Sequence, residues 1–223
     1  MDFSNPTAPS IASRFPELKS RASCRGFAVY KNRTTVFESH IELCVIWICS
    51  TMPDVVEIID QPPAVTYVDS AGIPRKHTFD FLVIMADGRR LFLMVKPAAK
   101  ATKARALARM IAGQLAAGTA NSIHVVTDAD FSRTDRHNAQ LLFECMRFPI
   151  SAHDSAIDSI TVNMAGAVKV NELVSASGLG GLGFRAVMRA LARGILAPAE
   201  PGARITADSY VVRNKAPQCS VAA

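Results

Sequence analysis

Apolar and polar residues recur along the chain in short runs that predict alternating strands and helices. Runs that are β-branched or have a two-residue period predict strands at 26–31, 55–59, 64–68, 79–85, 90–95 and 123–127. Apolar residues spaced three to four positions apart predict helices at 37–50, 100–117 and 135–147. Asp87 and Gly88 separate two of the strands and predict a hairpin. A helix before the last strand makes this an α/β protein with a mixed sheet flanked by helices.

After Pro149 the pattern changes to short helices, predicted at 152–164, 169–175 and 182–193. The apolar segments 195–196 and 205–211 then flank a loop that contains Pro201 and Gly202. Three short helices followed by a small hairpin are typical of a winged helix-turn-helix. We therefore expect a flexible, mobile arm over 1–24, an α/β domain over 25–149, a small winged-helix-like domain over 150–213 and a tail over 214–223.

Composition narrows the class of protein and of partner. Hydrophobic residues at 49% and charged residues at 20% indicate a folded globular protein. The excess of 25 Lys and Arg over 19 Asp and Glu, +6, favours a polyanionic partner such as DNA, RNA or a membrane surface. The apolar stretch 43–49 is too short to span a bilayer, and no leader pattern opens the chain, so we expect a cytoplasmic location. The five cysteines form no Cys-x-x-Cys pair, and we assign them no chemistry.

Charged residues at one end of the predicted hairpin form a candidate nuclease site. Asp80 and Lys96 flank the two strands, and Glu42 lies on the preceding helix. Hydrolysis of a phosphodiester needs a divalent cation and an activated water, and Mg²⁺ prefers oxygen ligands. Glu42, Asp80 and the carbonyl of Val95 would hold Mg²⁺ or Mn²⁺, while Lys96 would orient or activate the water. Met94, two residues before the lysine, supplies no oxygen ligand.

The same residues have a plainer interpretation. An aspartate before one strand and a lysine after another are ordinary solvated or ion-paired positions, and Glu42 is then a charge on the surface of a helix. Met94 would be a flexible residue that fills the core. Glu57, on a predicted strand, is a conceivable substitute for the missing ligand.

Several segments together resemble the TnsA family of transposon endonucleases, which belongs to the restriction-endonuclease-like PD-(D/E)xK superfamily. These are residues 38–43, 54–62, 78–83, 87–88 and 95–99, in the order and spacing of the family, and the resemblance covers residues 25–147. It implies that Glu42 is the acidic residue of the helix, Asp80 the metal-binding aspartate and Lys96 the catalytic lysine. Gln61 matches a recurrent Gln-Pro with a structural role. The family has Glu or Gln where this chain has Met94.

Basic residues in two regions are candidates for contact with the DNA backbone. The set near the proposed site is Arg75, Lys76, Lys100 and Lys103, with Arg105 beside it. In the C-terminal region Arg185, Arg189 and Arg193 recur every four residues along the candidate recognition helix. This stripe would either follow phosphates or form an ordinary solvated face, and the region would bind DNA or dock a protein. His77 is a further residue with the chemistry to bind phosphate, although a lone histidine more often has a structural role.

We therefore expect a TnsA-like, metal-dependent DNA endonuclease that cuts double-stranded DNA at transposon ends. The resemblance implies a transposase and an ATP-dependent regulator as partners. The alternative is a catalytically inactive DNA-binding or adaptor protein on the same fold, and a third hypothesis is a stand-alone restriction or repair nuclease. Met94 is the residue that separates the first two.

Overall fold

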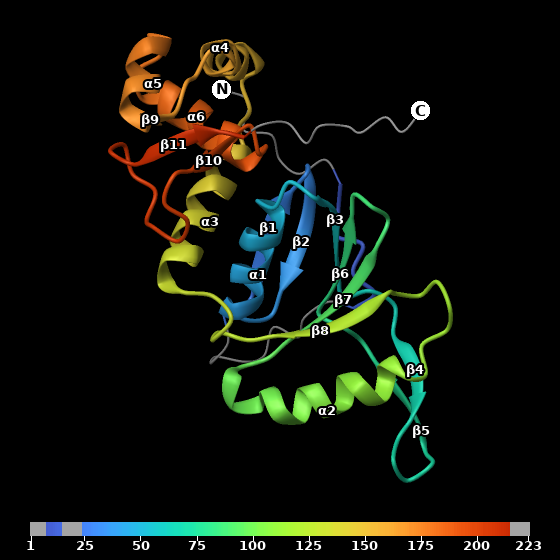
Figure 1. Ribbon diagram of the computed structural model, residues 1–223. Coiled ribbons are helices and arrows are strands. Elements are labelled where there is room, and N and C mark those ends of the chain that lie inside the picture. The colour runs from blue at the N-terminus through green and yellow to red at the C-terminus, as the bar shows by residue number, and fades with distance from the viewer. Residues whose placement is uncertain (1–7, 15–23, 215–223) are drawn as a thin grey trace, which may run out of the picture. The chain divides into compact units, whose positions relative to one another are not determined.

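The computed structural model describes residues 8–14 and 24–214, and the chain forms two compact units (Figure 1). The first unit comprises residues 1–50 and 54–132, and the second comprises residues 51–53 and 133–223. Each contains its own cluster of buried apolar side chains.

A mixed four-stranded sheet forms the centre of the first unit. Its strands are β3 (Val55–Asp60), β6 (Phe81–Met85), β7 (Arg90–Val95) and β8 (Ser122–Val126), in the order β3-β6-β7-β8. β3, β6 and β7 are antiparallel neighbours, whereas β8 runs parallel to β7. A parallel pair needs a crossover, which η1 (Ala98–Lys100) and α2 (Ala101–Ala112) provide. The predicted mixed α/β sheet is confirmed.

The β6–β7 hairpin determines which residues meet at its open end. Its turn contains Gly88, whose φ of 83° lies in the left-handed region that a residue without Cβ adopts easily. Across the hairpin Phe81 pairs with Leu93. Asp80 immediately precedes β6 and Lys96 immediately follows β7, so the register places both residues at the end away from the turn.

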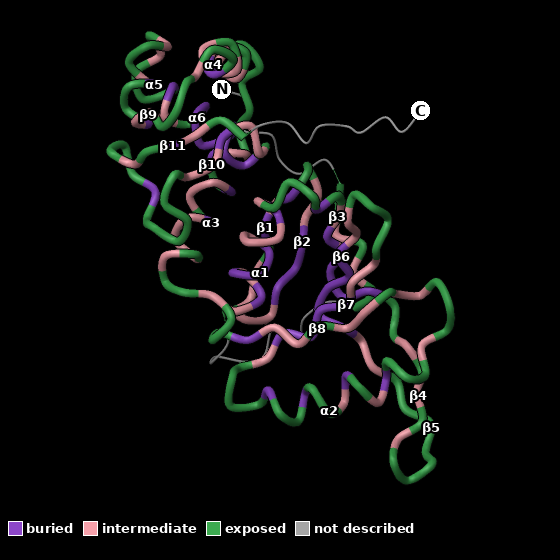
Figure 2. The backbone as a smooth tube through the Cα atoms, viewed as in Figure 1, coloured by how far each residue is buried: buried purple, intermediate pink, exposed green. Residues whose placement is uncertain are grey.

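One face of the sheet is covered by α2. The buried residues of this helix recur along one side of it (Figure 2), as expected of an amphipathic helix. The cluster between helix and sheet consists of Phe79, Leu82, Phe92, Met94, Ala104, Ala108 and Ile111. Phe79 and Phe92 stack with their ring centroids 4.3 Å apart. Residues that alternate with these along β6 and β7 point to the opposite face.

The remaining elements of the first unit are α1 (His40–Ser50) and two hairpins. β1 (Gly26–Tyr30) pairs with β2 (Arg33–Phe37), and β4 (Val65–Val68) pairs with β5 (Pro74–His77). The sequence analysis did not predict β2 or β5. The β5 segment Pro-Arg-Lys-His has no alternation of apolar and polar residues that would predict a strand. It is a strand only because it pairs with β4.

Residues 8–14 are hydrogen-bonded to other segments of the first unit, whereas the sequence predicted a mobile arm there. The amide of Thr34 donates to the carbonyl of Ala8 at 3.1 Å, and the amide of Ser13 donates to the carbonyl of Gln61 at 2.8 Å. The Ser10 hydroxyl donates to Asp60 Oδ2 at 2.6 Å. The other parts of the predicted arm, and the tail from 215 onward, lie outside the described residues.

The second unit consists of helices around a small sheet. Its elements are α3 (Arg133–Met146), α4 (Ser151–Val162), β9 (Ala167–Lys169), α5 (Val170–Ser177), α6 (Gly181–Ala192), β10 (Leu196–Pro198) and β11 (Tyr210–Arg213). The strands are antiparallel in the order β10-β11-β9. The predicted two-stranded hairpin therefore has a third strand, β9, which is too short to show a sequence period.

The division between the units lies before α3, earlier than the predicted boundary at residue 149. The physical reason is that α3 packs against the core of the second unit. Its Cys145 is buried in that core, and Leu141 and Leu142 pack against it. In residues 8–14 and 24–214, every helix is too short or too polar to cross a membrane.

Candidate active site

Asp80 and Lys96 meet at the open end of the β6–β7 hairpin, as the sequence predicted. The Oδ2 atom of Asp80 accepts a hydrogen bond from the amide of Val95 at 2.6 Å. The same oxygen lies 3.1 Å from Nζ of Lys96. The Asp80 side chain is only 10% exposed, whereas that of Lys96 is 35% exposed. The carboxylate is thus fixed within the protein while the ammonium group remains accessible to solvent.

The backbone of Asp80 joins three segments of the sheet. Its amide donates to the carbonyl of Leu93 at 3.1 Å, and its carbonyl accepts from the amide of Gln61 at 3.0 Å. Asp80 is therefore held by β7 on one side and by the residue that follows β3 on the other. Hydrogen bonds on both sides give the carboxylate a defined position.

Glu42 lies in the first turn of α1 and is 6% exposed. Its carboxylate accepts from the amide of Glu38 at 2.6 Å and from the hydroxyl of Ser39 at 3.0 Å. The Ser39 hydroxyl also accepts from the amide of Glu42 at 3.2 Å, which makes a reciprocal cap at the start of the helix. Glu42 is thus a buried carboxylate and not the surface charge of the plainer interpretation.

The charge of Asp80 acts on Glu42. Burial raises the pKa of Glu42 above its ordinary value, and the hydrogen bond from the Glu38 amide partly opposes that shift. The negative charge of Asp80 raises the pKa of Glu42 further, because two carboxylates that lie close together resist joint ionisation. A dication between them would relieve both effects.

Met94 fills the apolar core between the sheet and α2. It is 1% exposed and belongs to the cluster that contains Phe79 and Phe92. Its thioether is a soft, weak ligand for Mg²⁺. The plainer interpretation of this residue as a core filler therefore holds.

The oxygen atoms at this site suit a hard cation that retains several waters. Two carboxylates, Asp80 and Glu42, come from different elements, and Mg²⁺ often binds proteins through only one or two carboxylates. The hydrogen bonds to Asp80 within the described residues reach Oδ2 and leave Oδ1 available. The amide of Val95 donates to the Asp80 carboxylate, so the backbone at Val95 lies beside it. Within 8–14 and 24–214, His, Cys, Asp and Glu form no group of three or more arranged for a metal.

Glu57, the conceivable substitute for the missing ligand, pairs with an arginine. Its Oε1 atom lies 2.8 Å from Nη1 of Arg33, with which it forms an ion pair. Its role as a substitute ligand stays a prediction.

Two further residues, His77 and Arg14, interact with groups of the site, and neither was predicted as a site residue. His77 lies at the end of β5, and its buried Nε2 atom has no hydrogen-bond partner among the described residues. Burial lowers the pKa of His77; the negative charge of Asp80 opposes this, and the positive charges of Lys96 and Arg14 add to it. Arg14, from the segment 8–14, donates from Nε to Oε1 of Gln61 at 2.7 Å. Only the basic character of Arg14 was visible in the sequence.

The charged side chains on the exposed face of α2 are all cationic. Lys103, Arg105 and Arg109 are exposed on the helix, as is Lys100 just before it, and the sequence contains no Asp or Glu between Asp87 and Asp128. On the β4–β5 hairpin, Lys76 is exposed, whereas Arg75 is ion-paired with Asp69 at 2.9 Å. The predicted basic residues are therefore densest on α2, and their contact with DNA stays a prediction.

The arginine stripe of α6 has a different arrangement from the one predicted. Arg189 is 3% exposed, and its Nε donates to Oδ1 of Asp154 at 2.7 Å. Arg193 makes a bidentate pair with Asp158 at 3.0 and 2.7 Å. Arg185 is exposed. The prediction that Arg189 follows phosphates is corrected, because its guanidinium is used inside the second unit.

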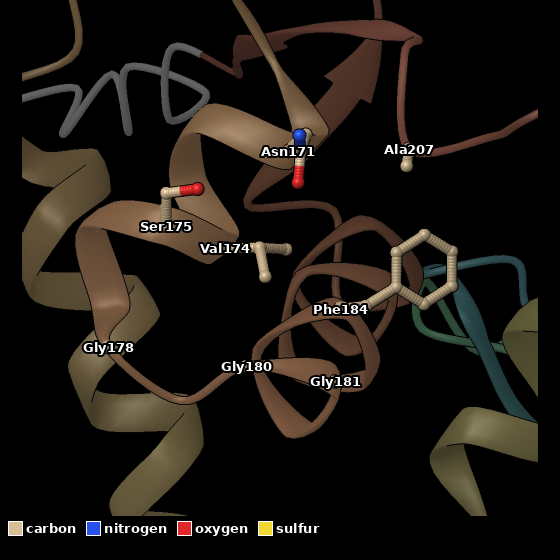
Figure 3. A pocket seen from close by; sticks show the side chains of 8 residues that line it. All are labelled: Asn171, Val174, Ser175, Gly178, Gly180, Gly181, Phe184 and Ala207. Atoms are coloured by element: carbon tan, nitrogen blue, oxygen red, sulfur yellow. The ribbon is translucent and has the colours of Figure 1, made fainter.

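α6 is enclosed over most of its length. Its residues from Ala186 to Ala192 are buried, and it contacts α3, α4 and α5. An open hollow of about 520 Å³ lies beside its first turn (Figure 3). Asn171, Val174, Ser175, Gly178, Gly180, Gly181, Phe184 and Ala207 line the hollow. None of the predicted site residues is among them.

Comparison with known families gives one match. Residues 52–119 match the family model described as "TnsA-like endonuclease N terminal". The matched segment contains Asp80, Met94 and Lys96. A comparison with curated proteins gives no match.

Proposed function

We propose that the chain is a metal-dependent DNA endonuclease of a transposition system, because residues 52–119 match the TnsA-like endonuclease family. One observation carries the proposal. Asp80 Oδ2 accepts from the Val95 amide and from Lys96 Nζ, beside a buried carboxylate whose pKa responds to it. Two carboxylates can hold a divalent cation for phosphodiester hydrolysis, and a lysine beside them can orient water or stabilise negative charge.

Each residue has a distinct task in this proposal. Glu42, Asp80 and the Val95 carbonyl would hold Mg²⁺ or Mn²⁺, which when bound offsets negative charge on the phosphate and favours ionisation of water. Lys96, held by Asp80 and accessible to solvent, orients the attacking water or the phosphate oxygens. The hydrogen bonds of Asp80 to Val95 and Gln61 fix this arrangement in advance of binding.

The cationic surface of α2 supports a DNA backbone as the ligand. Arg105 and Arg109 are one turn apart, and like charges at this spacing destabilise a helix. Lys103 lies in the first turn, where a positive charge opposes the helix dipole. These costs to helix stability are understandable if the surface binds phosphates, which give sequence-independent affinity. Lys76 would contribute from β5.

The buried position of Met94 favours the adaptor as the second candidate function. If the thioether simply fills the core, the site has only two carboxylate side chains, whereas the family has a third side chain that supplies an oxygen. A protein of this kind would bind DNA at transposon ends and leave cleavage to another subunit.

The second unit is proposed to dock a protein partner. Its element order α4-β9-α5-α6-β10-β11 and strand order β10-β11-β9 support the winged helix-turn-helix expected from the sequence. In DNA-binding members of that class the last helix enters the major groove. Here α6 contacts three helices, so little of its surface is left for a groove. A transposase or an ATP-dependent regulator is the class of partner that the family implies.

A cleavage assay tests the proposed function. Purified protein is incubated with supercoiled and linear DNA carrying transposon ends, in Mg²⁺ or Mn²⁺, with and without the transposase of the same element. We expect cleavage that is lost in Asp80→Asn and Lys96→Ala and retained in Asp87→Asn, a control at the exposed hairpin turn. DNA binding without cleavage under every condition would overturn the enzyme and favour the adaptor.

A further inference from the structure

We propose that the N-terminal segment supplies a phosphate-binding group, Arg14, to the active site, and that Gln61 positions it. This inference rests on the proposed function, because it concerns how the same site binds DNA. Arg14 precedes β1 and is far from Asp80 in sequence, so only the fold brings it near the site.

Residues 8–14 are held to the first unit at successive points. Ala8 forms an isolated bridge with Arg33, and Ser10 donates to the buried carboxylate of Asp60. Ser13 donates its amide to the carbonyl of Gln61. The chain is thus guided from β2 toward the end of β3, where Arg14 emerges.

Gln61 joins Arg14 to Asp80 directly. Its side-chain oxygen accepts from Nε of Arg14 at 2.7 Å, and its backbone amide donates to the carbonyl of Asp80 at 3.0 Å. Gln61 is 1% exposed and has a φ of 42°, in the left-handed region that is unfavourable for a residue with a side chain. A strained, buried glutamine that accepts a hydrogen bond from an exposed arginine can fix the orientation of that arginine. Strain of this kind concentrates at functional sites.

The guanidinium of Arg14 remains available to a ligand. Its side chain is 54% exposed, and Nη2 lies 3.5 Å from Oε1 of Glu38, a loose pairing. The bond to Gln61 uses one of the five N–H donors of an arginine. A guanidinium fixed through Nε can still present its outer edge to phosphate oxygens, and arginine binds phosphate well through two parallel bonds.

The charge of Arg14 is felt within the site. It acts on the pKa of His77 together with the charges of Asp80 and Lys96, so all three charged groups lie within electrostatic range of one imidazole. The Nε2 atom of that imidazole is buried and lacks a partner in the described part of the chain. A DNA strand that contacts Lys96 would therefore pass near Arg14. The ligand is the phosphodiester backbone of duplex DNA, contacted next to the phosphate that Lys96 faces.

Salt-dependent binding tests this inference without requiring catalysis. The full chain carrying Asp80→Asn is titrated with a short fluorescent DNA duplex at several KCl concentrations. In this background, Arg14→Ala should weaken binding and reduce the slope of log K against log salt by about 0.9, the value for one phosphate contact on B-DNA. Arg14→Lys should retain the slope, because its charge is kept.

A matched control and a coupled variant separate contact from folding. Arg89 is similarly exposed and also donates through Nε, to Asp87 at 2.6 Å at the turn end of the hairpin. Arg89→Ala should leave the slope unchanged. Gln61→Leu keeps the charge of Arg14 but removes the acceptor that orients it, so it should weaken binding while the slope stays near the parent's. In the Arg14→Ala background Gln61→Leu should weaken binding no further, because the contact it orients is already absent.

The outcomes distinguish this inference from the proposed function. An Arg14→Ala protein with the parent's slope and the parent's thermal transition would overturn the inference, whether or not the native chain cleaves DNA. A reduced slope in a native chain that never cleaves would support the contact and overturn only the nuclease. Absence of DNA binding in the parent would overturn the contact as well.

Discussion

The Asp80 carboxylate lies 2.6 Å from the amide of Val95, and this contact fixes the site from within the sheet. Asp80 is buried, so its removal leaves the Val95 amide without its acceptor. An unsatisfied buried donor costs about 1–3 kcal/mol. Asp80→Ala should therefore accelerate hydrogen exchange at the Val95 amide by about 5- to 150-fold, since each 1.4 kcal/mol corresponds to a factor of ten.

Asp80→Asn is the matched variant, because its amide oxygen can still accept from Val95. We expect a smaller change in exchange, although the ion pair to Lys96 is lost. Exchange rates that are equal in the two variants would contradict this account of how Asp80 is held.

The protonation of Glu42 should make the stability of the first unit fall as pH rises. Burial raises the pKa of Glu42, and the charge of Asp80 adds to that shift. The folded protein then binds more protons than the unfolded chain between the two pKa values of this group, so stability decreases with pH across that interval. The stabilising contribution of protonated Glu42 is fully present below the unfolded pKa and is lost as pH rises through the folded pKa. Glu42→Gln should remove it, as urea unfolding monitored by Trp47 fluorescence at a series of pH values will show.

The Ser39 hydroxyl provides an independent check on the Glu42 carboxylate. Its hydrogen bond lowers the pKa of Glu42 and so opposes the effect of burial. Ser39→Ala should raise the pKa of Glu42 further, measured from the carbon-13 shift of its carboxyl. It should also cost about 1 kcal/mol through loss of the helix cap. A fall in the pKa would exclude this role of Ser39.

Met94→Gln should destabilise the first unit. Met94 is packed in an apolar cluster, and an amide buried without partners costs about 1–3 kcal/mol. Met94→Leu conserves volume and should change stability by less than about 1.5 kcal/mol. Unfolding in urea compares the two. If Met94→Gln is as stable as the native chain and cleaves DNA better, position 94 reaches the site and its assignment to the core is wrong.

The sequence predicted the site best where local structure determines it. Asp80 and Lys96 meet because Asp87 and Gly88 turn one hairpin and the strand register then brings its ends together. Alternation alone placed Met94 and Lys96 on one side of β7. It could not show that the side of Met94 is filled by α2, since that depends on how a later helix packs.

The parts that the sequence did not predict depend on partners distant in the chain. Arg14 has no periodic context, and its position depends on Gln61. Arg189 belongs to a regular stripe on α6, yet its partner Asp154 lies on α4, 35 residues earlier. A cation that follows phosphates and a cation that pairs inside the protein look alike in sequence, because spacing carries no information about the facing element.

Reversal of one charge on α2 should change stability and DNA affinity in opposite directions. Lys103 lies in the first turn of the helix, where a negative side chain stabilises by about 0.3–1 kcal/mol. Lys103→Glu should therefore increase stability and weaken DNA binding, and Lys103→Gln should have a smaller effect on both. Thermal unfolding and fluorescence anisotropy measure the two quantities. Unchanged affinity in Lys103→Glu would exclude this surface from the DNA contact.

Arg189 and Arg193 should behave differently when each is replaced by methionine. Arg189→Met leaves the partly buried Asp154 without its partner and should cost about 3–5 kcal/mol. Arg193→Met breaks an exposed pair with Asp158 and should cost about 0–1 kcal/mol. Hydrogen–deuterium exchange of residues 181–192 reports the loss in the second unit, and Arg189→Met combined with Asp154→Leu should recover part of it. If Arg189→Met leaves that exchange unchanged and weakens DNA binding as much as Arg185→Met does, α6 carries a phosphate-tracking stripe and its proposed role in protein docking is wrong.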